Sequence, residues 1–310
     1  MKDGQIPGSR RRFCLSDLFR RRRGLRGAGS LLLFCYLLSP PAFLGSCRKL
    51  PPPAEEVDPS ASAAVVDTVT MRLKITADRW PVRRLDVFCY GAEGTQQLVL
   101  YARRDSLPEV LDMDVPEGGK AVVCIANSPH DFNLGALARF DAMAQLSYGF
   151  RDDDPQAPVL GGWAEMPDSG GELVLQPLLC RVVLTSVANT IDGYELLEDP
   201  RVRLRDLPDA AEILRERDFR PTELIDAGPW VPLPCDVGYF PQEPQISLWC
   251  YPNDTPEHIL GTPRPTLEFE CTIRGEACSF DVPLPPLSRA GSLEVSLTVN
   301  GPDDFRYKIR

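Results

Sequence analysis

The sequence predicts a mainly β protein built from two β-sandwiches, on the basis of three observations. Short segments in which apolar and polar residues alternate recur along the chain, as in VTMRLKI at 69–75, which is the period of a half-buried strand. Turn-forming residues separate these segments, and helix-like patterns are confined to one or two short stretches. The chain has 31 prolines, which long helices exclude and strand ends tolerate. Many short strands with few helices favour paired sandwiches.

Residues 1–46 have the layout of an export signal. An arginine-rich arm leads into a short apolar run, LLLFCYLLSPPAFLGSC at 31–47. The run is broken by two prolines and is too short to span a bilayer, which takes about 20 apolar residues. Cys47 follows small residues, as in a bacterial lipobox, so we expect signal cleavage between Ser46 and Cys47 and a lipid on Cys47. An ordinary signal peptide that ends near a cysteine is the alternative.

The next segment, 47–64, predicts an extended tether. Its sequence, CRKLPPPAEEVDPSASAA, is rich in proline, alanine and acidic residues. The acidic patch at 55–58 resembles the signal that sends some lipoproteins to the outer face of the outer membrane. Residues 1–46 hold one lysine and eight arginines against two aspartates, so the net charge of −10 for the whole chain becomes −17 for the remainder. Such an acidic chain repels phosphate backbones, and we expect no nucleic-acid partner.

The first sandwich is expected over residues 65–178. A helix is predicted at 133–146, where NLGALARFDAMAQL spaces its apolar residues for a helix lying against the sheet. The predicted strands are 69–75, 84–90, 97–102, 110–115, 120–126 and 172–178.

The second sandwich is expected over residues 179–310. A short helix is predicted at about 209–217, and a proline-rich loop at 228–244. The predicted strands are 181–187, 201–207, 246–251, 265–275, 278–284 and 292–299.

The sequence contains few of the patterns that are typical of catalytic or metal-binding sites. Phosphate-binding glycine motifs, a GxSxG elbow and HExxH are absent. His130 and His258 are the only histidines, which leaves little for a zinc site or a His-activated nucleophile. The acidic run at 152–154 lacks calcium-loop spacing and predicts a solvated loop. We therefore expect no enzyme, no catalytic residues, no metal and no cofactor; a two-carboxylate glycosidase stays as a distant alternative.

The cysteines and tryptophans are expected to pack in the cores. No CxxC spacing occurs, and most cysteines lie inside strand patterns, so buried free thiols are expected. A Cys271–Cys278 disulfide is an open alternative. For Trp163 and Trp230 the alternative to core packing is a sugar-stacking platform, which defines a second class of function, a surface glycan-binding lipoprotein.

The order of segments carries a family resemblance. A lipobox cysteine and a proline-rich spacer precede a strand that closes on Asp78-Arg79-Trp80. Then come RRLDVFCYG, KAVVCIANS and, after the helical segment, ELVLQPLLCRVVLTS. This order resembles the fimbrillin superfamily and, within it, the FimB-like anchor subunits of type V pili. The resemblance spans nearly the whole chain from Cys47 and rests on diffuse motifs.

The resemblance implies a fold, a mechanism and a location. The fold is two tandem transthyretin-like β-sandwiches. The function is that of an outer-membrane lipoprotein at the cell surface, a fimbrial anchor or minor subunit joined to other fimbrial subunits by β-strand donation. Polymerising subunits of the family lose their N-terminal segment to cleavage after an arginine, for which Arg72, Arg79 and Arg84 are candidates here. A tip adhesin is the alternative role.

The C-terminal tail suits the donor role. Residues 305–310, FRYKIR, alternate Phe305, Tyr307 and Ile309 with three basic residues. Burial of three such side chains in a neighbour's groove would contribute roughly 1.5–3 kcal/mol each. The alternative is that the segment closes its own domain as an edge strand.

Overall fold

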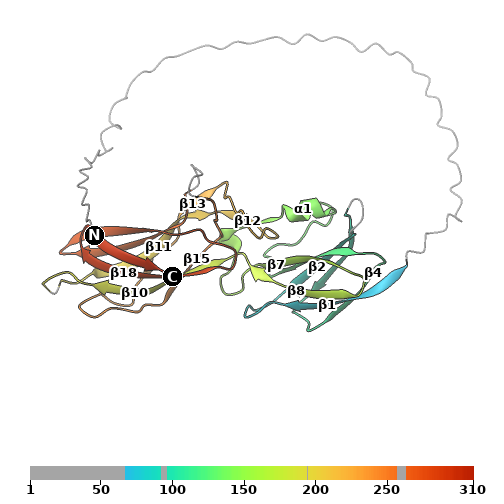
Figure 1. Cartoon of the computed structure of the whole chain (residues 1–310), viewed down its shortest axis with the longest axis horizontal. Coiled ribbons are helices and arrows are strands. Elements are labelled where there is room, and N and C mark those ends of the chain that lie inside the picture. The colour runs from blue at the N-terminus through green and yellow to red at the C-terminus, as the bar shows by residue number, and fades with distance from the viewer. Residues whose placement is uncertain (1–66, 92–95, 194, 257–262) are drawn as a thin grey trace, which may run out of the picture. The chain divides into compact units, whose positions relative to one another are not determined.

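The computed structural model describes residues 67–91, 96–193, 195–256 and 263–310, and these form two pairs of β-sheets and one further two-stranded sheet (Figure 1). Apart from the two-stranded sheet, strands up to Pro177 build the first pair, and strands from Cys180 onward build the second. The mainly β, tandem-sandwich fold predicted from the sequence is confirmed. Among the described residues, no helix has the length and apolar character needed to cross a bilayer.

The smaller sheet of the first sandwich has three strands, in the order β4-β1-β8. The central strand β1 (Thr68–Thr76) runs antiparallel to β4 (Leu111–Pro116) and parallel to β8 (Gly170–Val174). Its burial alternates with a period of two residues, as the sequence predicts for a strand with one buried face.

The larger sheet of the first sandwich has the order β3-β2-β5-β7-β9. The strands β2 and β5 are buried along nearly their whole length. One face contacts the core between the two sheets, and the other lies beneath connecting segments. The strands are β2 (Leu85–Gly91), β3 (Leu98–Arg104), β5 (Lys120–Ala126), β7 (Leu160–Met166) and β9 (Gln176–Pro177).

The second sandwich packs the sheet β15-β10-β18-β19 against the sheet β13-β11-β16-β17, with β14 also paired to β11. A separate apolar core fills the space between these sheets. The strands of the first sheet are β10 (Cys180–Asn189), β15 (Ile246–Cys250), β18 (Ser292–Gly301) and β19 (Asp304–Ile309). The strands of the second are β11 (Glu198–Pro208), β13 (Leu224–Ala227), β14 (Val231–Pro232), β16 (Thr266–Ile273) and β17 (Glu276–Pro283).

Segments from both halves of the chain pair at the junction between the sandwiches. The short strand β6 (Ser147–Gly149) pairs with β12 (Ala210–Glu212), and a single 3-10 turn (Phe150–Asp152) follows β6. A third apolar cluster joins Tyr90 of the first half to Tyr251 of the second. The two sandwiches therefore share a buried apolar contact in addition to a chain connection.

The helix predicted at 133–146 is much shorter than expected, since only α1 (Phe140–Ala144) forms. The Asn133 side chain accepts hydrogen bonds from two nearby backbone N–H groups and makes a turn instead. Arg139 forms an isolated β-bridge with Gln97 and has an extended backbone, so the helix begins only at Phe140. Met143 is buried in the junction cluster, so the short helix still packs on the sheet.

The helix predicted at 209–217 is wrong, because the segment begins as β12. Main-chain hydrogen bonds from Phe150 to Asp209 and from Ile213 to Leu146 tie it to the first half of the chain. Tertiary pairing therefore overrides a weak local helix preference.

Two further parts of the first sandwich differ from the sequence prediction. The single strand expected at 172–178 is two strands in different sheets, β8 and β9, and the chain crosses between the sheets at Leu175. The strand β7 had no prediction, because Gly161 and Gly162 weaken its strand pattern. Close packing accounts for these glycines, since a Cβ at Gly161 would lie 2.5 Å from a side-chain atom of Ile213.

The expectation of free thiols is confirmed for the seven cysteines after Cys47. All are free, and all except Cys235 are buried. Cys271 and Cys278 lie directly opposite each other on β16 and β17 as separate thiols. Burial raises the pKa of Cys89 to about 11, which keeps that thiol protonated and unreactive.

Candidate subunit-joining strands

The predicted donor residues lie on the last strand of the second sandwich. Strand β19 pairs with β18 alone, so it forms an edge of its sheet. Phe305 and Ile309 pack against the core as half-buried side chains, and the Phe305 ring lies 5.1 Å from that of Phe280 in the opposite sheet. Tyr307 is 45% exposed. In the isolated chain this segment is an edge strand, and its donation to a neighbour stays a prediction.

The other face of β19 is basic. Arg306, Lys308 and Arg310 are exposed, and like the apolar residues they alternate along the strand. At its end, the backbone of Arg310 exchanges two hydrogen bonds of 3.0 Å with Glu294 on β18. A single ladder of backbone hydrogen bonds, to β18, therefore holds β19 in its sheet.

The first described strand, β1, also has an apolar face and a face with basic residues, but its apolar face is more deeply buried. Met71 and Leu73 are 0% exposed, and they contact the core between the sheets. On the outer face Arg72 Nε lies 2.9 Å from Asp112 Oδ1 of β4, and Lys74 Nζ lies 2.8 Å from Glu172 Oε1 of β8. Each neighbouring strand therefore contributes a carboxylate to β1.

The three arginines considered as cleavage sites have different surroundings. Arg72 lies within β1. Arg84 is paired with the buried Asp86 at 2.7 Å. Arg79 lies exposed in the turn after β1, with its guanidinium 5.2 Å from the centre of the Trp80 ring. Of the three, only Arg79 lies in a turn.

The tryptophans considered as sugar platforms are partly covered by neighbouring side chains. Trp230 lies under two guanidinium groups, with Arg203 4.1 Å and Arg201 4.7 Å from its ring centre. Trp163 is 38% exposed and packs against Phe140. A different aromatic pair had no sequence prediction: Tyr239 and Phe240, each about three-quarters exposed, in the proline-rich loop.

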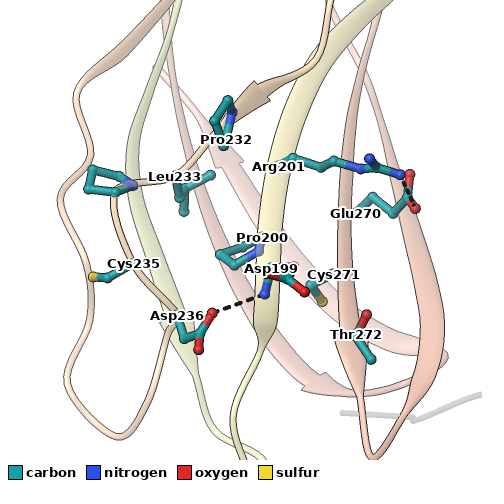
Figure 2. A pocket seen from close by; sticks show the side chains of 11 residues that line it. Asp199, Pro200, Arg201, Pro232, Leu233, Cys235, Asp236, Glu270, Cys271 and Thr272 are labelled. Carbon is teal, nitrogen blue, oxygen red and sulfur yellow. Dashed lines mark hydrogen bonds and ion pairs between the residues drawn. The ribbon is translucent and has the colours of Figure 1, made fainter.

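A surface hollow of about 760 Å³ lies beside β11, and Figure 2 shows its lining. Its polar groups bind one another. Arg201 pairs with Glu270 at 2.7 Å, and the Asp236 carboxylate accepts the backbone N–H of Asp199 at 2.9 Å. The Cys235 side chain points away from this hydrogen bond (Figure 2). The contact with Asp199 holds the loop around Asp236 against β11. The residues that line the hollow include no nucleophile beside a general base.

Asp86 and Asp153 are two of the buried carboxylates that the sequence did not reveal. Asp86, fully buried on β2, accepts from the Tyr101 hydroxyl at 2.6 Å and pairs with Arg84 and Arg103. Asp153 accepts from Tyr251 Oη at 3.0 Å and from a backbone N–H, and burial raises its pKa to about 6. Nothing in the strand periodicity distinguishes either residue from a surface aspartate.

The guanidinium of Arg289 is a third feature that the sequence does not reveal. It donates to five main-chain oxygens from both halves of the chain, and burial lowers its pKa to about 10. These oxygens belong to Gly161, Gln176, Pro177, Ile213 and Arg215.

The predicted lipid site, Ser46 and Cys47, lies outside the described residues, as does His258. Within the described part of the chain, no group of three or more His, Cys, Asp or Glu side chains is arranged to hold a metal ion.

Comparison with known proteins places the fold among fimbrial proteins. No family model and no curated protein matches the chain. A protein of Parabacteroides distasonis ATCC 8503, whose proposed role is cell adhesion, is similar over 78% of this chain and 95% of its own, with a TM-score of 0.60 and 11% identity. The tip fimbrial protein Mfa3 of Porphyromonas gingivalis is similar over 79% and 99%, with a TM-score of 0.54 and 13% identity.

A fimbrilin (FimA) of Porphyromonas gingivalis W83 is also similar, over 76% of this chain and 90% of its own, with a TM-score of 0.54 and 9% identity. At these identities the likeness concerns the fold, which this chain therefore shares with fimbrial subunits along most of its described length.

Proposed function

We propose that the protein is a non-catalytic fimbrial subunit at the cell surface, a member of the fimbrillin superfamily that joins its neighbours by β-strand donation. The observation that carries the proposal is the position of β19. A chain with the fold of fimbrial proteins ends in a strand held by a single ladder, with an aromatic residue of its inner face 45% exposed. An edge strand of this kind is suited to pairing with another chain.

The attachment to the membrane is part of the same proposal. The lipobox pattern at Ser46 and Cys47 supports a lipid anchor in the outer membrane, and the proline-rich residues 47–64 would hold the sandwiches away from it. A chain that keeps its lipidated N-terminus would be an anchor subunit. Cleavage in the exposed turn at Arg79 would release the anchor together with β1 and would favour a polymerising or tip subunit.

Deletion of residues 303–310 in the native cells tests the donor role. We expect subunits that still reach the surface but no longer enter fimbriae, because the strand that links them is missing. Replacement of Arg306 by Gln is the matched control, since it changes an exposed outer-face residue and keeps the strand. Fimbriae that assemble and remain attached without residues 303–310 would contradict strand donation.

Mass spectrometry of the mature N-terminus tests the anchor. A lipidated Cys47 would support an anchor subunit, and a start directly after Arg72, Arg79 or Arg84 would support a polymerising subunit. An unmodified terminus at any other position would contradict both forms of the proposal.

Adhesion is a second candidate function, favoured by the exposed Tyr239–Phe240 pair. Two aromatic rings with centres 5.4 Å apart at a loop surface offer stacking faces to a glycan. We expect glycan-array binding to fall when Tyr239 and Phe240 are replaced by Ala and to survive Trp230→Ala, because guanidinium groups already cover that ring. Unchanged binding in the double variant would exclude this surface.

A further inference from the structure

A second surface hollow, of about 620 Å³, lies in the second sandwich beside the exposed aromatic pair. Residues 189–193 and Glu195 line it from the end of β10 and the segment that follows, and residues 239–241 line it from the proline-rich loop. Tyr239 and Phe240 are each about three-quarters exposed. Large aromatic side chains that face solvent beside a hollow of roughly 300–1,000 Å³ suit the binding of a ligand.

One buried side chain holds the two segments of the hollow together. Asn189 Nδ2 donates to the main-chain oxygen of Glu195 at 2.7 Å and to that of Val237 at 3.0 Å. Its Oδ1 accepts the backbone N–H of Ile191 at 3.0 Å. An isolated β-bridge between Leu197 and Val237 adds a second link. Because both segments are fixed before a ligand arrives, binding costs little further ordering of the chain.

The charged side chains in the lining of the hollow are acidic. They are Asp192, which is exposed, and Glu195, and the described lining residues include no Lys, Arg or His. Glu195 Oε1 lies 3.1 Å from the Nε atom of Arg274, in the turn between β16 and β17. Since Arg274 offsets the charge of Glu195, Asp192 gives the lining its net negative charge. The hollow therefore attracts a cationic ligand and repels a carboxylate.

The aromatic pair has the same preference for positive charge. The rings of Tyr239 and Phe240 have centres 5.4 Å apart and planes at 85° to each other, so their faces point in different directions. An aromatic face attracts an ammonium group through the negative potential above the ring. The apolar face of a sugar ring can stack on the same surface. A ligand that carries an ammonium group on a sugar ring would use both properties.

We infer that this hollow binds an amino sugar, with the protonated amine beside Asp192 and the sugar ring against Tyr239 or Phe240. The inference rests on adhesion as the second candidate function and adds the class of glycan. An acidic sugar would be repelled by the carboxylate of Asp192. A neutral sugar would keep the stacking contact but would lose the attraction to the carboxylate and to the aromatic face, so it should bind more weakly.

The test compares three trisaccharides by isothermal titration of the full chain. The glucosamine trisaccharide carries free amines, the N-acetylglucosamine trisaccharide has the same linkage without the charge, and the galacturonic acid trisaccharide is anionic. We expect the glucosamine form to bind about tenfold more tightly than the N-acetylated form, and the anionic form not to bind. Added salt should reduce the preference for the amine, because salt screens charges and leaves stacking largely unchanged.

Two variants assign the contributions of the carboxylate and of the rings. Asp192→Asn removes the charge and keeps the size of the side chain, so the glucosamine form should bind about threefold more weakly while the N-acetylated form is unaffected. Replacement of both Tyr239 and Phe240 by Ala should weaken both forms at least about tenfold. Asp226→Asn is the matched control, since Asp226 is an exposed aspartate on β13, and it should change neither affinity.

Each contrary result overturns a different part of the inference. Equal binding of the amine and N-acetylated forms, unchanged by Asp192→Asn, would overturn the amine as the recognised group and leave the aromatic pair as a glycan surface. Equally tight binding of a lysine tripeptide would overturn the sugar as its carrier. Binding of none of the trisaccharides would overturn adhesion through this surface. The fimbrial role would still stand, because the deletion of residues 303–310 tests it separately.

Discussion

Arg289 Nη2 donates a hydrogen bond of 2.8 Å to the main-chain oxygen of Gly161, which ties a loop of the second sandwich to strand β7 of the first. The same guanidinium binds four more main-chain oxygens, among them Gln176 at 2.7 Å and Ile213 at 2.6 Å. Its partners are carbonyl dipoles, each of which needs a hydrogen-bond donor when buried. One side chain thus holds three separate segments at the junction.

Arg289→Met should destabilise the protein by about 3 kcal/mol, because several buried carbonyls lose their donor at once. Thermal unfolding of the full chain measures the effect. Arg306→Met is the matched control, since Arg306 is exposed on β19, and it should change stability little. Equal melting temperatures for the two variants would contradict the role of Arg289 as a junction contact.

Gly161→Ala should also weaken the junction. The added Cβ would lie 2.5 and 2.8 Å from side-chain atoms of Ile213, so that either β7 or the segment after β12 must shift. We expect a loss of about 1–3 kcal/mol, as for other overpacked sites. Gly301→Ala is the control, because no atom lies within 4 Å of its Cβ position. Urea denaturation of both variants would show whether the close approach is required.

Asp153→Asn should stabilise the protein at neutral pH. Burial raises the pKa of this carboxyl from 3.8 to about 6, so the folded state holds the proton more tightly than the unfolded state. Ionisation of Asp153 in the folded state therefore lowers the free energy of unfolding. This loss is absent below about pH 4, grows between about pH 4 and 6, and reaches roughly 3 kcal/mol above about pH 6. The amide still accepts from Val159 and can donate to the Tyr251 hydroxyl.

Urea denaturation at pH 4 and pH 7.5 measures this difference. The Asn variant should be more stable than the native chain at pH 7.5 and equal to it at pH 4. Asp226→Asn, at an exposed aspartate, should show no such pH dependence. A variant that is less stable at pH 7.5 would mean that the ionised carboxylate is favourable where it lies.

Asp86→Ala should destabilise the first sandwich by about 3 kcal/mol. Asp86 is fully buried and is the shared partner of Arg84, Arg103 and the Tyr101 hydroxyl. Its removal takes the buried carboxylate away from both guanidinium groups, which keep the exposed Asp131 as an acidic partner. Asp112→Ala is the comparison, because it removes an exposed ion pair with Arg72 and should have little effect. Guanidinium denaturation would rank the two, and a reversed order would contradict the assignment.

The strands that the sequence predicts well are those with a clean period of two. The segments 69–75 and 292–299 became β1 and β18 because one face of each meets a core and the other meets solvent or paired charges. Strand β2 was also found, although it is buried on both faces, since its run of apolar residues ends at turn residues.

Contacts between distant segments decided the elements that were missed. Strand β7 contains Gly161 and Gly162 where Ile213 and Val174 approach closely, and no local pattern reports such neighbours. Segment 210–212 is a strand because Leu146 and Ser147 lie beside it. The tail was identified as a strand with an apolar face, but its pairing with β18 in the isolated chain depends on the three-dimensional fold.

Site-specific cross-linking from position 307 in intact cells tests strand donation most directly. A photo-reactive amino acid replaces Tyr307, fimbriae are irradiated, and the partner peptide is identified by mass spectrometry. We predict cross-links from position 307 to a second subunit of the fimbria. Cross-links confined to the same chain, to Leu297 and its neighbours on β18, would contradict it.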